Sequence, residues 1–180
     1  MTRPRNLAKN WRAHLPPVVI ADASPLIGLA KIGRLALLGQ LYQRVLIPPA
    51  VHAELQAGSQ RPGGVELLQA LDEGWLTVAD SADIPEAARA ELKQVLDAGE
   101  AEAIVLALHL PARLLLIDEQ RGRAVAQLKG VPIAGTGVVL LAAKRLGYIE
   151  NVTSELEALH QSGYRLSARL RRELAAMAGE

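Results

Sequence analysis

The stretch Val18-Val19-Ile20-Ala21-Asp22-Ala23-Ser24-Pro25 decides the fold class of this chain. Its first four residues are apolar and three of them are β-branched, which favours a strand buried on both faces. Asp22 ends the apolar run, and Pro25 suits the first turn of a helix because its missing N–H has no partner there anyway. A buried strand followed directly by a helix is typical of a parallel α/β sheet.

The same alternation of short apolar runs and helical stretches continues along the chain. Four further strands are predicted at 44–47, 76–79, 114–117 and 131–134. Helices are predicted at 25–32, 35–41, 49–57, 85–96, 99–109, 119–129, 136–145, 154–161 and 167–177. Pro132 cannot donate a ladder hydrogen bond, so the last strand is expected at an edge of the sheet. The sequence therefore predicts an α/β/α sandwich around a parallel sheet of about five strands.

The composition limits the class of protein further. The chain has 180 residues, half of them hydrophobic, with no Phe and no Cys. The core must be aliphatic, and disulfides and thiolate metal sites are excluded. No secretory signal or apolar stretch of membrane-spanning length is visible, so we expect a cytoplasmic protein without a membrane partner. We expect a basic N-terminal extension (1–16), a main domain (17–149) and C-terminal helical segments packed on it (150–180).

The charges are unevenly distributed although the net charge is only +1. From Asp72 to Glu119 there are eleven acids and three bases. From Gln120 to Ile149 there are five bases and no acid. Solvated helix faces explain such blocks, and so does an acidic site rimmed by cations that attract phosphate.

Acidic side chains lie where a parallel sheet places its ligand site, at the carboxyl ends of the strands. Asp22 follows the first predicted strand and Asp118 the fourth, while Glu54 and Glu102 lie on helices beside them. Carboxylates that converge repel one another unless a cation is bound between them. Oxygen-only ligands suit Mg²⁺ or Mn²⁺. Such an ion supports hydrolysis of a phosphodiester by water.

Each of these acids also has a structural explanation. Asp22 and Asp118 can be helix N-caps. Glu54 can interact with a helix dipole, and Glu102 can be an ordinary surface residue. The prediction of a metal site therefore depends on all four acids occurring together, and not on any one of them.

Other enzyme classes are poorly matched. The turn after the first strand has no glycine-rich phosphate loop, and the chain has no G-x-S-x-G nucleophile motif. The four histidines show no metal-ligand spacing. A phosphatase-like hydrolase with Asp22 as its nucleophile would want a second acid where Ser24 stands.

The ordered set of motifs resembles the PIN-domain family, in particular VapC-like toxin ribonucleases. Asp22-Ala23-Ser24-Pro25 resembles the first PIN motif, and Pro48-Pro49 through Glu54 the second. Gly99-Glu100-Ala101-Glu102 resembles the third and Ile117-Asp118-Glu119 through Arg123 the fourth. The segments 135–145 and 162–167 resemble one PIN subfamily, commonly described as predicted nucleic-acid-binding proteins.

The resemblance implies a Rossmann-like sandwich with strand order 3-2-1-4-5 and a Mg²⁺- or Mn²⁺-dependent endoribonuclease, commonly the toxin of a toxin–antitoxin pair. Asp22 and Asp118 are expected to anchor the metal, and Glu54 and Glu102 to complete the site. We choose Glu102 as the third acid because its helix register matches the family pattern, and Glu100 is the other candidate.

Further roles follow from the same resemblance. Ser24 is expected to orient Asp22 or to cap the helix, and Thr136 to cap the helix that it begins. Arg121 and Arg123 are expected to hold RNA phosphates or to be solvated surface. A homodimer and a small antitoxin partner are also expected, the dimer partly from the apolar runs 35–38 and 138–141. The alternative is a catalytically weak or inactive PIN fold that binds nucleic acid or a partner.

Overall fold

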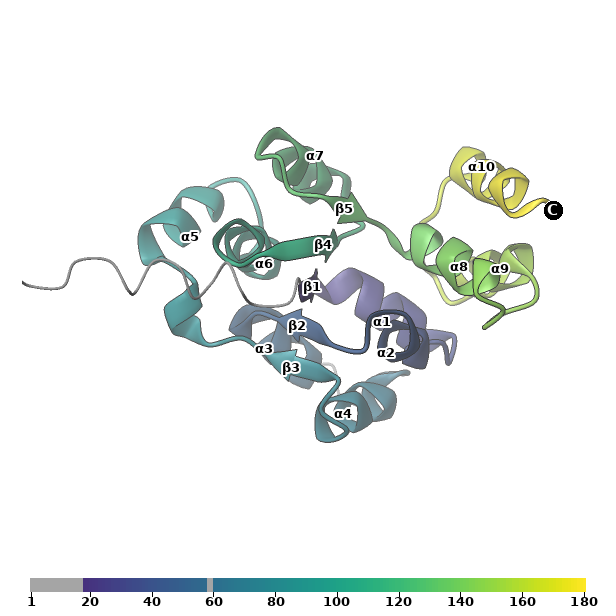
Figure 1. Cartoon of the computed structure of the whole chain (residues 1–180), viewed down its shortest axis with the longest axis horizontal. Coiled ribbons are helices and arrows are strands. Elements are labelled where there is room, and N and C mark those ends of the chain that lie inside the picture. The colour runs from purple at the N-terminus through teal and green to yellow at the C-terminus, as the bar shows by residue number, and fades with distance from the viewer. Residues whose placement is uncertain (1–17, 58–59) are drawn as a thin grey trace, which may run out of the picture.

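A five-stranded, all-parallel sheet forms the centre of the protein. The computed structural model describes residues 18–57 and 60–180 (Figure 1). The sheet has the order β3-β2-β1-β4-β5, which confirms the predicted fold class and strand order. The strands are β1 (Val18–Ala21), β2 (Val45–Ile47), β3 (Leu76–Val78), β4 (Ala112–Leu116) and β5 (Ile133–Ala134). The predicted extension 1–16 lies outside the described residues.

The strand register brings the ends of β1 and β4 together. Ala21 pairs with Leu116, and the backbone N–H of Asp22 donates to the carbonyl of Leu116 at 2.9 Å. The residues that follow these two strands therefore begin at the same edge of the sheet. β5 is an edge strand, as Pro132 predicted.

Helices cover both faces of the sheet (Figure 1). One face carries α5 (Glu86–Leu92), α6 (Ala98–His109) and α7 (Gln120–Leu128), and α1 (Ala23–Lys31), α2 (Ala36–Tyr42) and α8 (Thr136–Arg145) cover the other. The remaining helices are α3 (Pro49–Ala57), α4 (Gly64–Asp72), α9 (Val152–Gln161) and α10 (Ala168–Ala178), with a short 3-10 helix at Ser81–Asp83.

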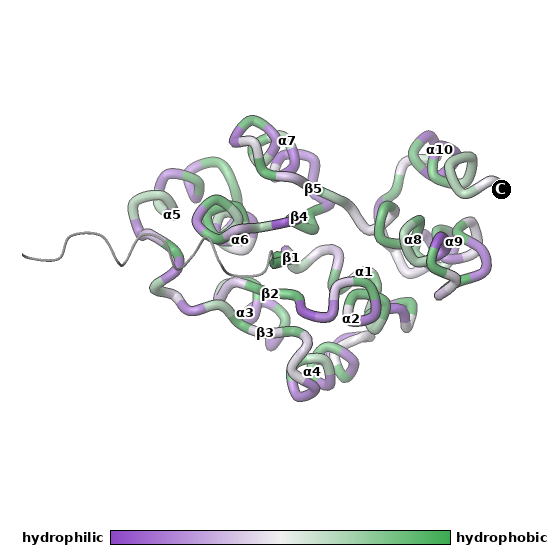
Figure 2. Tube along the Cα trace, viewed as in Figure 1, coloured by the Kyte–Doolittle hydropathy of each residue, from purple (hydrophilic) through white to green (hydrophobic). Residues whose placement is uncertain are grey.

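Two aliphatic cores result from the alternation of side chains along each strand. Val19 and Ala21 of β1 belong to the core beneath α1 and α8, whereas Ile20 belongs to the core beneath α6. α6 is buried on most of its surface, and its residues from Gly99 to Ala107 are all buried. Hydrophilic residues are instead spread along α7 in the outer layer (Figure 2).

The structure differs from the sequence prediction in a few elements. Helix α4 was not predicted, because Val65 and Leu68 are exposed and blur its apolar pattern. Helix α5 ends at Leu92, four residues earlier than predicted. The apolar runs that favoured a dimer lie mainly in the core, where Leu38 and Leu140 are fully buried, and only Ala36 and Val138 of the two runs are exposed.

The C-terminal helices pack against the sheet domain through α8. Helix α10 contacts α8 and α9, and Leu174 is the residue of α10 that is buried. The carboxylate of Glu180 accepts hydrogen bonds from Lys144 and from the backbone N–H of Val152, so it ties the end of the chain to both helices. Within residues 18–57 and 60–180, no helix is long and apolar enough to cross a bilayer.

Candidate active site

Asp22 is a buried carboxylate at the end of the central strand. It is the N-cap of α1, and its side chain accepts a long hydrogen bond of 3.4 Å from the backbone N–H of Ser24. Only 4% of its surface is exposed. Burial raises the pKa of Asp22 to about 6, and the nearby Asp97 and Glu54 act in the same direction. Asp22 therefore caps α1 and also lies close to other acidic side chains.

The first turn of α6 brings two more acids toward Asp22. Asp97 is the N-cap of this helix, and its Oδ1 accepts from the backbone N–H of Glu100 at 2.8 Å. A Cβ added at Gly99 would lie 3.3 Å from Oδ1 of Asp22 and 3.6 Å from Oδ1 of Asp97. The start of α6 therefore lies directly against the end of β1.

Glu100 lies close enough to Asp22 for the two charges to interact, and it is equally buried, with 4% of its surface exposed. Burial raises its pKa to about 7, with Asp97 and Asp22 adding to the effect. Within the described part of the chain, its Oε1 is buried without a hydrogen-bond partner. A Cβ at Gly122 of α7 would lie only 2.5 Å from this oxygen, so glycine is required there for the carboxylate to fit. A buried, unsatisfied carboxylate oxygen is costly and points to a missing cation or donor.

Glu102 is directed away from this group. Its Oε2 accepts from the backbone N–H of Ala50 at 2.9 Å, at the start of α3. Its Oε1 forms an ion pair with Arg89 of α5 at 3.2 Å. Each oxygen of the Glu102 carboxylate thus has a partner on another helix, Ala50 of α3 or Arg89 of α5, and neither partner belongs to the group around Asp22.

Asp118 lies two residues beyond β4 and holds the start of α8. Its Oδ1 accepts from the backbone N–H of Thr136 at 2.9 Å, and its Oδ2 accepts from the Thr136 hydroxyl at 2.7 Å. The Tyr164 hydroxyl also donates to Oδ2. Thr136 therefore donates to an acid in the segment after β4 rather than capping its own helix with its side chain. Asp118 in turn makes no cap hydrogen bond to α7, whose N-cap is Glu119.

Tyr164 reaches the site from the loop between α9 and α10. Its ring packs on α1, where a Cβ at Gly28 would lie 2.6 Å from the ring, so that only glycine leaves room for it. Burial and the adjacent Asp118 raise the pKa of Tyr164 well above its usual range. The phenol therefore stays protonated and remains a hydrogen-bond donor to Asp118.

The other predicted residues lie around the cluster. Glu54 is exposed on α3, and partial desolvation together with Asp97 raises its pKa while Arg61 opposes the shift. Ser24 is half-buried and contributes its backbone N–H to Asp22. Arg123 donates from Nη1 to the carbonyl of Ile117 at 2.9 Å, next to Asp118, whereas Arg121 is exposed.

The arrangement is an acidic cluster without an internal cation. In the described residues, no ion pair involves Asp22, Glu100 or Asp118. The same part of the chain holds no group of three Asp, Glu or His side chains arranged to hold a metal ion. Asp22 and Glu100 form the buried centre. Asp118 follows the neighbouring strand β4, with both oxygens engaged, and it shares Tyr164 with Asp22 as a charge that raises the pKa of this phenol.

A family model described as PIN domain matches residues 18–180. The chain belongs to the PIN-domain family. This match confirms the family resemblance predicted from the motifs. PIN domains are generally nucleases that typically use divalent metal ions, so the fold is a nuclease fold with nucleic acid as its class of substrate. No curated protein matches the chain.

Two residues of this PIN domain were missed by the sequence prediction. Asp97 was signalled by the pattern Asp-x-x-Glu at 97–100, which is typical of a capped helix start. Tyr164 lies within the segment 162–167 that resembles the PIN subfamily, but nothing in its local sequence places it beside Asp118. That contact spans 46 residues of the chain.

Proposed function

We propose that this PIN domain is a Mg²⁺- or Mn²⁺-dependent endoribonuclease centred on Asp22 and Glu100, with Asp118 beside them. The observation that carries the proposal is the pair of buried carboxylates at the end of the central strand, one with an unsatisfied oxygen. Two ionised carboxylates so placed repel each other, and a bound divalent cation would relieve that repulsion.

The donor set fits such an ion. All candidate ligands are carboxylate oxygens, which Mg²⁺ and Mn²⁺ prefer. Mg²⁺ is commonly held by one or two carboxylates and keeps several of its waters, so a site of two buried acids is sufficient. Asp22 and Glu100 would hold the ion. Asp118 would act from the position that Thr136 and Tyr164 give it.

The residues of this chain would then divide the work of hydrolysis. A divalent ion, when bound, lowers the pKa of water and stabilises charge that develops on the phosphate. Thr136 and Tyr164 fix the orientation of Asp118, and Gly122 leaves room for Glu100. Arg123, anchored beside Asp118, attracts the phosphate to the acidic edge.

Metal-dependent cleavage of RNA is the direct test. We expect the purified chain to cut a labelled single-stranded RNA internally when Mn²⁺ or Mg²⁺ is added, and to stop when EDTA removes the ion. Isothermal titration of Mn²⁺ gives an independent readout, because binding should be seen even without RNA. Cleavage that persists in EDTA, or no binding of Mn²⁺, would contradict the proposal.

Removing the Tyr164 hydroxyl should impair catalysis without disturbing the fold. Tyr164→Phe keeps the ring on Gly28 and deletes only the hydrogen bond to Asp118. We expect kcat to fall about tenfold, the equivalent of about 1.4 kcal/mol, which is typical of one hydrogen bond to a charged group. The Mn²⁺ concentration for half-maximal rate should fall, because Asp118 loses a competing donor.

Tyr148→Phe is the matched control, since Tyr148 is 45% exposed and lies outside the site. A wild-type kcat and Mn²⁺ dependence for Tyr164→Phe would mean that the hydroxyl does not position Asp118. A purely structural role would instead lower the urea midpoint and leave the Mn²⁺ dependence unchanged.

The engagement of Asp118 favours a second candidate function. Because Thr136 and Tyr164 already occupy both of its oxygens, the chain is alternatively a catalytically weak PIN fold that binds nucleic acid or a partner. RNA binding with no metal-dependent cleavage would distinguish it.

The VapC-like toxin role, the small antitoxin and the homodimer are the finer part of the proposal. An acidic cluster without an internal cation supports inhibition by a partner, because an antitoxin Arg or Lys can neutralise the same charge as the metal. The homodimer rests on the family resemblance, since most of the apolar runs that suggested it are buried.

A further inference from the structure

A hollow of about 300 Å³ opens beside Asp118, between α7, α8 and the C-terminal segment. We name it the C-terminal hollow; its apolar lining is Val138, Leu166, Leu170 and Leu174. Its polar lining consists of Asp118, Arg123, Tyr164 and Arg165. Its volume falls at the lower end of the range for ligand pockets, roughly 300–1,000 Å³. It thus adjoins the proposed active site through Asp118.

The lining combines apolar side chains with two cations, Arg123 and Arg165, and with the carboxylate of Asp118, whose oxygens accept hydrogen bonds from Thr136 and Tyr164. Val138 is 47% and Leu170 is 40% exposed, so an apolar wall is open to a ligand. Arg165 is exposed at the rim, and the guanidinium of Arg123 is anchored to the carbonyl of Ile117. A ligand with a flat apolar part and an anionic part fits this wall and these charges. Nucleotides have both parts, a base and a phosphate.

A second hollow of about 390 Å³ adjoins the first. The two share Tyr164, Arg165 and Leu166, which lie on the loop between α9 and α10. Arg165 therefore lines both hollows, and a chain-like anion can contact its guanidinium from either of them.

We propose that the C-terminal hollow binds a base of single-stranded RNA next to the phosphate that is cut, with Arg165 and Arg123 holding adjacent phosphates. The proposal rests on the nuclease function above and adds to it a site that selects an unpaired nucleotide. Single strands expose their bases for contact with protein side chains, whereas a duplex keeps them stacked and paired. The C-terminal helices are then part of the substrate site.

The test measures RNA binding separately from cleavage. Leu170→Glu places a charge in the apolar wall, and Arg165→Ala removes one phosphate contact from an exposed position. With a fluorescein-labelled single-stranded RNA in EDTA, we expect Leu170→Glu to weaken binding about tenfold, within the range for loss of one base contact. Arg165→Ala should reduce the slope of log affinity against log salt by about 0.7, the value for one contact to a single strand.

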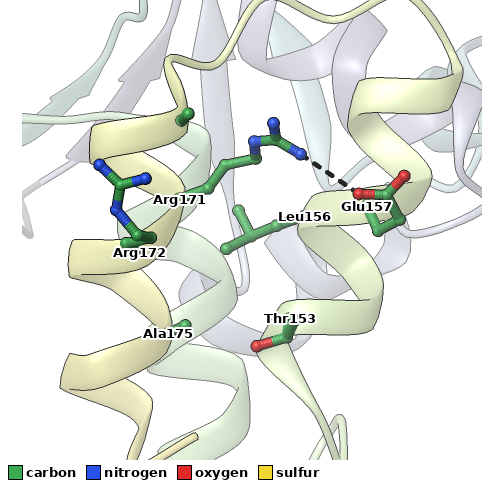
Figure 3. A pocket seen from close by; sticks show the side chains of 7 residues that line it. Thr153, Leu156, Glu157, Arg171, Arg172 and Ala175 are labelled. Atoms are coloured by element: carbon green, nitrogen blue, oxygen red, sulfur yellow. Dashed lines mark hydrogen bonds and ion pairs between the residues drawn. The ribbon is translucent and has the colours of Figure 1, made fainter.

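The matched controls lie on α10, the helix that carries Leu170, but outside the C-terminal hollow. Met177→Glu repeats the change from an apolar residue to Glu at a site that is 60% exposed. Arg172→Ala removes a charge that lines a different hollow, between α9 and α10, where Arg171 pairs with Glu157 (Figure 3). Both controls should bind RNA with an affinity within about twofold of the wild type, which corresponds to a change in binding free energy of about 0.4 kcal/mol.

The outcomes separate this inference from the nuclease proposal. Wild-type affinity in both Leu170→Glu and Arg165→Ala, or equal losses in the controls, would overturn the hollow as the RNA site. Weak binding by duplex RNA of the same sequence supports it, and equal binding of duplex counts against it. If RNA binding depends on Leu170 while no metal-dependent cleavage is found, the nuclease proposal fails and the hollow stands.

Discussion

Asp22→Asn is expected to reduce RNA cleavage by about a thousandfold or more and to make the metal-free protein more stable at neutral pH. A thousandfold loss corresponds to about 4 kcal/mol of transition-state stabilisation, in keeping with removal of a metal ligand. The fold should persist because Asn is as good an N-cap as Asp for α1. Initial rates with saturating Mn²⁺ measure the first effect, and thermal unfolding in EDTA measures the second.

The gain in stability follows from the sign of the pKa shift. Because the pKa of Asp22 rises from 3.8 to about 6 on folding, the folded state favours the protonated acid. The protonated side chain of Asp22 therefore adds to the free energy of unfolding. This contribution is complete below about 3.8, the pKa of the unfolded chain, and is lost as the pH rises through about 6. At neutral pH the ionised side chain therefore opposes folding, by roughly 1–3 kcal/mol. Asn removes this opposition, so the melting temperature should rise at pH 7.5 and stay nearly constant at pH 4.

Asp80→Asn provides the control for this variant. Asp80 is also an N-cap, accepting from the backbone N–H of Ala82 at 2.9 Å, but it is exposed and outside the acidic cluster. Its substitution should change neither the cleavage rate nor the pH dependence of stability. Full Mn²⁺-dependent activity in Asp22→Asn would place the catalytic centre elsewhere on the molecule.

The sheet could be predicted from the sequence because its signals are local. Each buried strand is a short apolar run, and Pro49 begins its helix where a proline is tolerated. The same signals predicted Asp22 and Asp118 at one edge of a parallel sheet, but β4 ends at Leu116 and Ala21 pairs with Leu116, so Asp118 lies one residue beyond the level of Asp22. Helix α4 was missed because two of its apolar residues, Val65 and Leu68, face solvent and obscure the helical period.

The details of the candidate site depend on contacts that no local pattern encodes. Glu100 and Glu102 are two residues apart on one helix, so their side chains point about 200° apart around its axis. One of them alone can face Asp22, and the family pattern favoured Glu102, but no local signal in the sequence shows which of the two carboxylates turns toward Asp22. In the structure Arg89 of α5 forms an ion pair with Glu102, and Gly122 of α7 leaves room for Glu100, and both contacts join α6 to other helices.

Glu100→Gln and Glu102→Gln should therefore have opposite consequences. Glu100→Gln is expected to lower cleavage by about a thousandfold and to stabilise the metal-free protein at neutral pH, since burial holds the pKa of Glu100 at about 7. Glu102→Gln should leave kcat within a few-fold of the wild type, because its carboxylate binds Ala50 and Arg89 rather than the cluster. It should also destabilise the fold by roughly 1–3 kcal/mol, as expected when a charged hydrogen bond is lost.

Urea unfolding and Mn²⁺-dependent initial rates on the two variants measure both effects in one comparison. Arg89→Ala is the control for the second variant, and it should reproduce the loss of stability with an intact catalytic rate, because it breaks the same ion pair along with the exposed pair between Arg89 and Glu86. The double variant Arg89→Ala with Glu102→Gln should lose less stability than the sum of the losses in the two single variants. If Glu102→Gln instead abolished cleavage in a stable protein while Glu100→Gln remained active, Glu102 would be the third acid, as the family pattern predicted, and the buried pair of Asp22 and Glu100 would need another explanation.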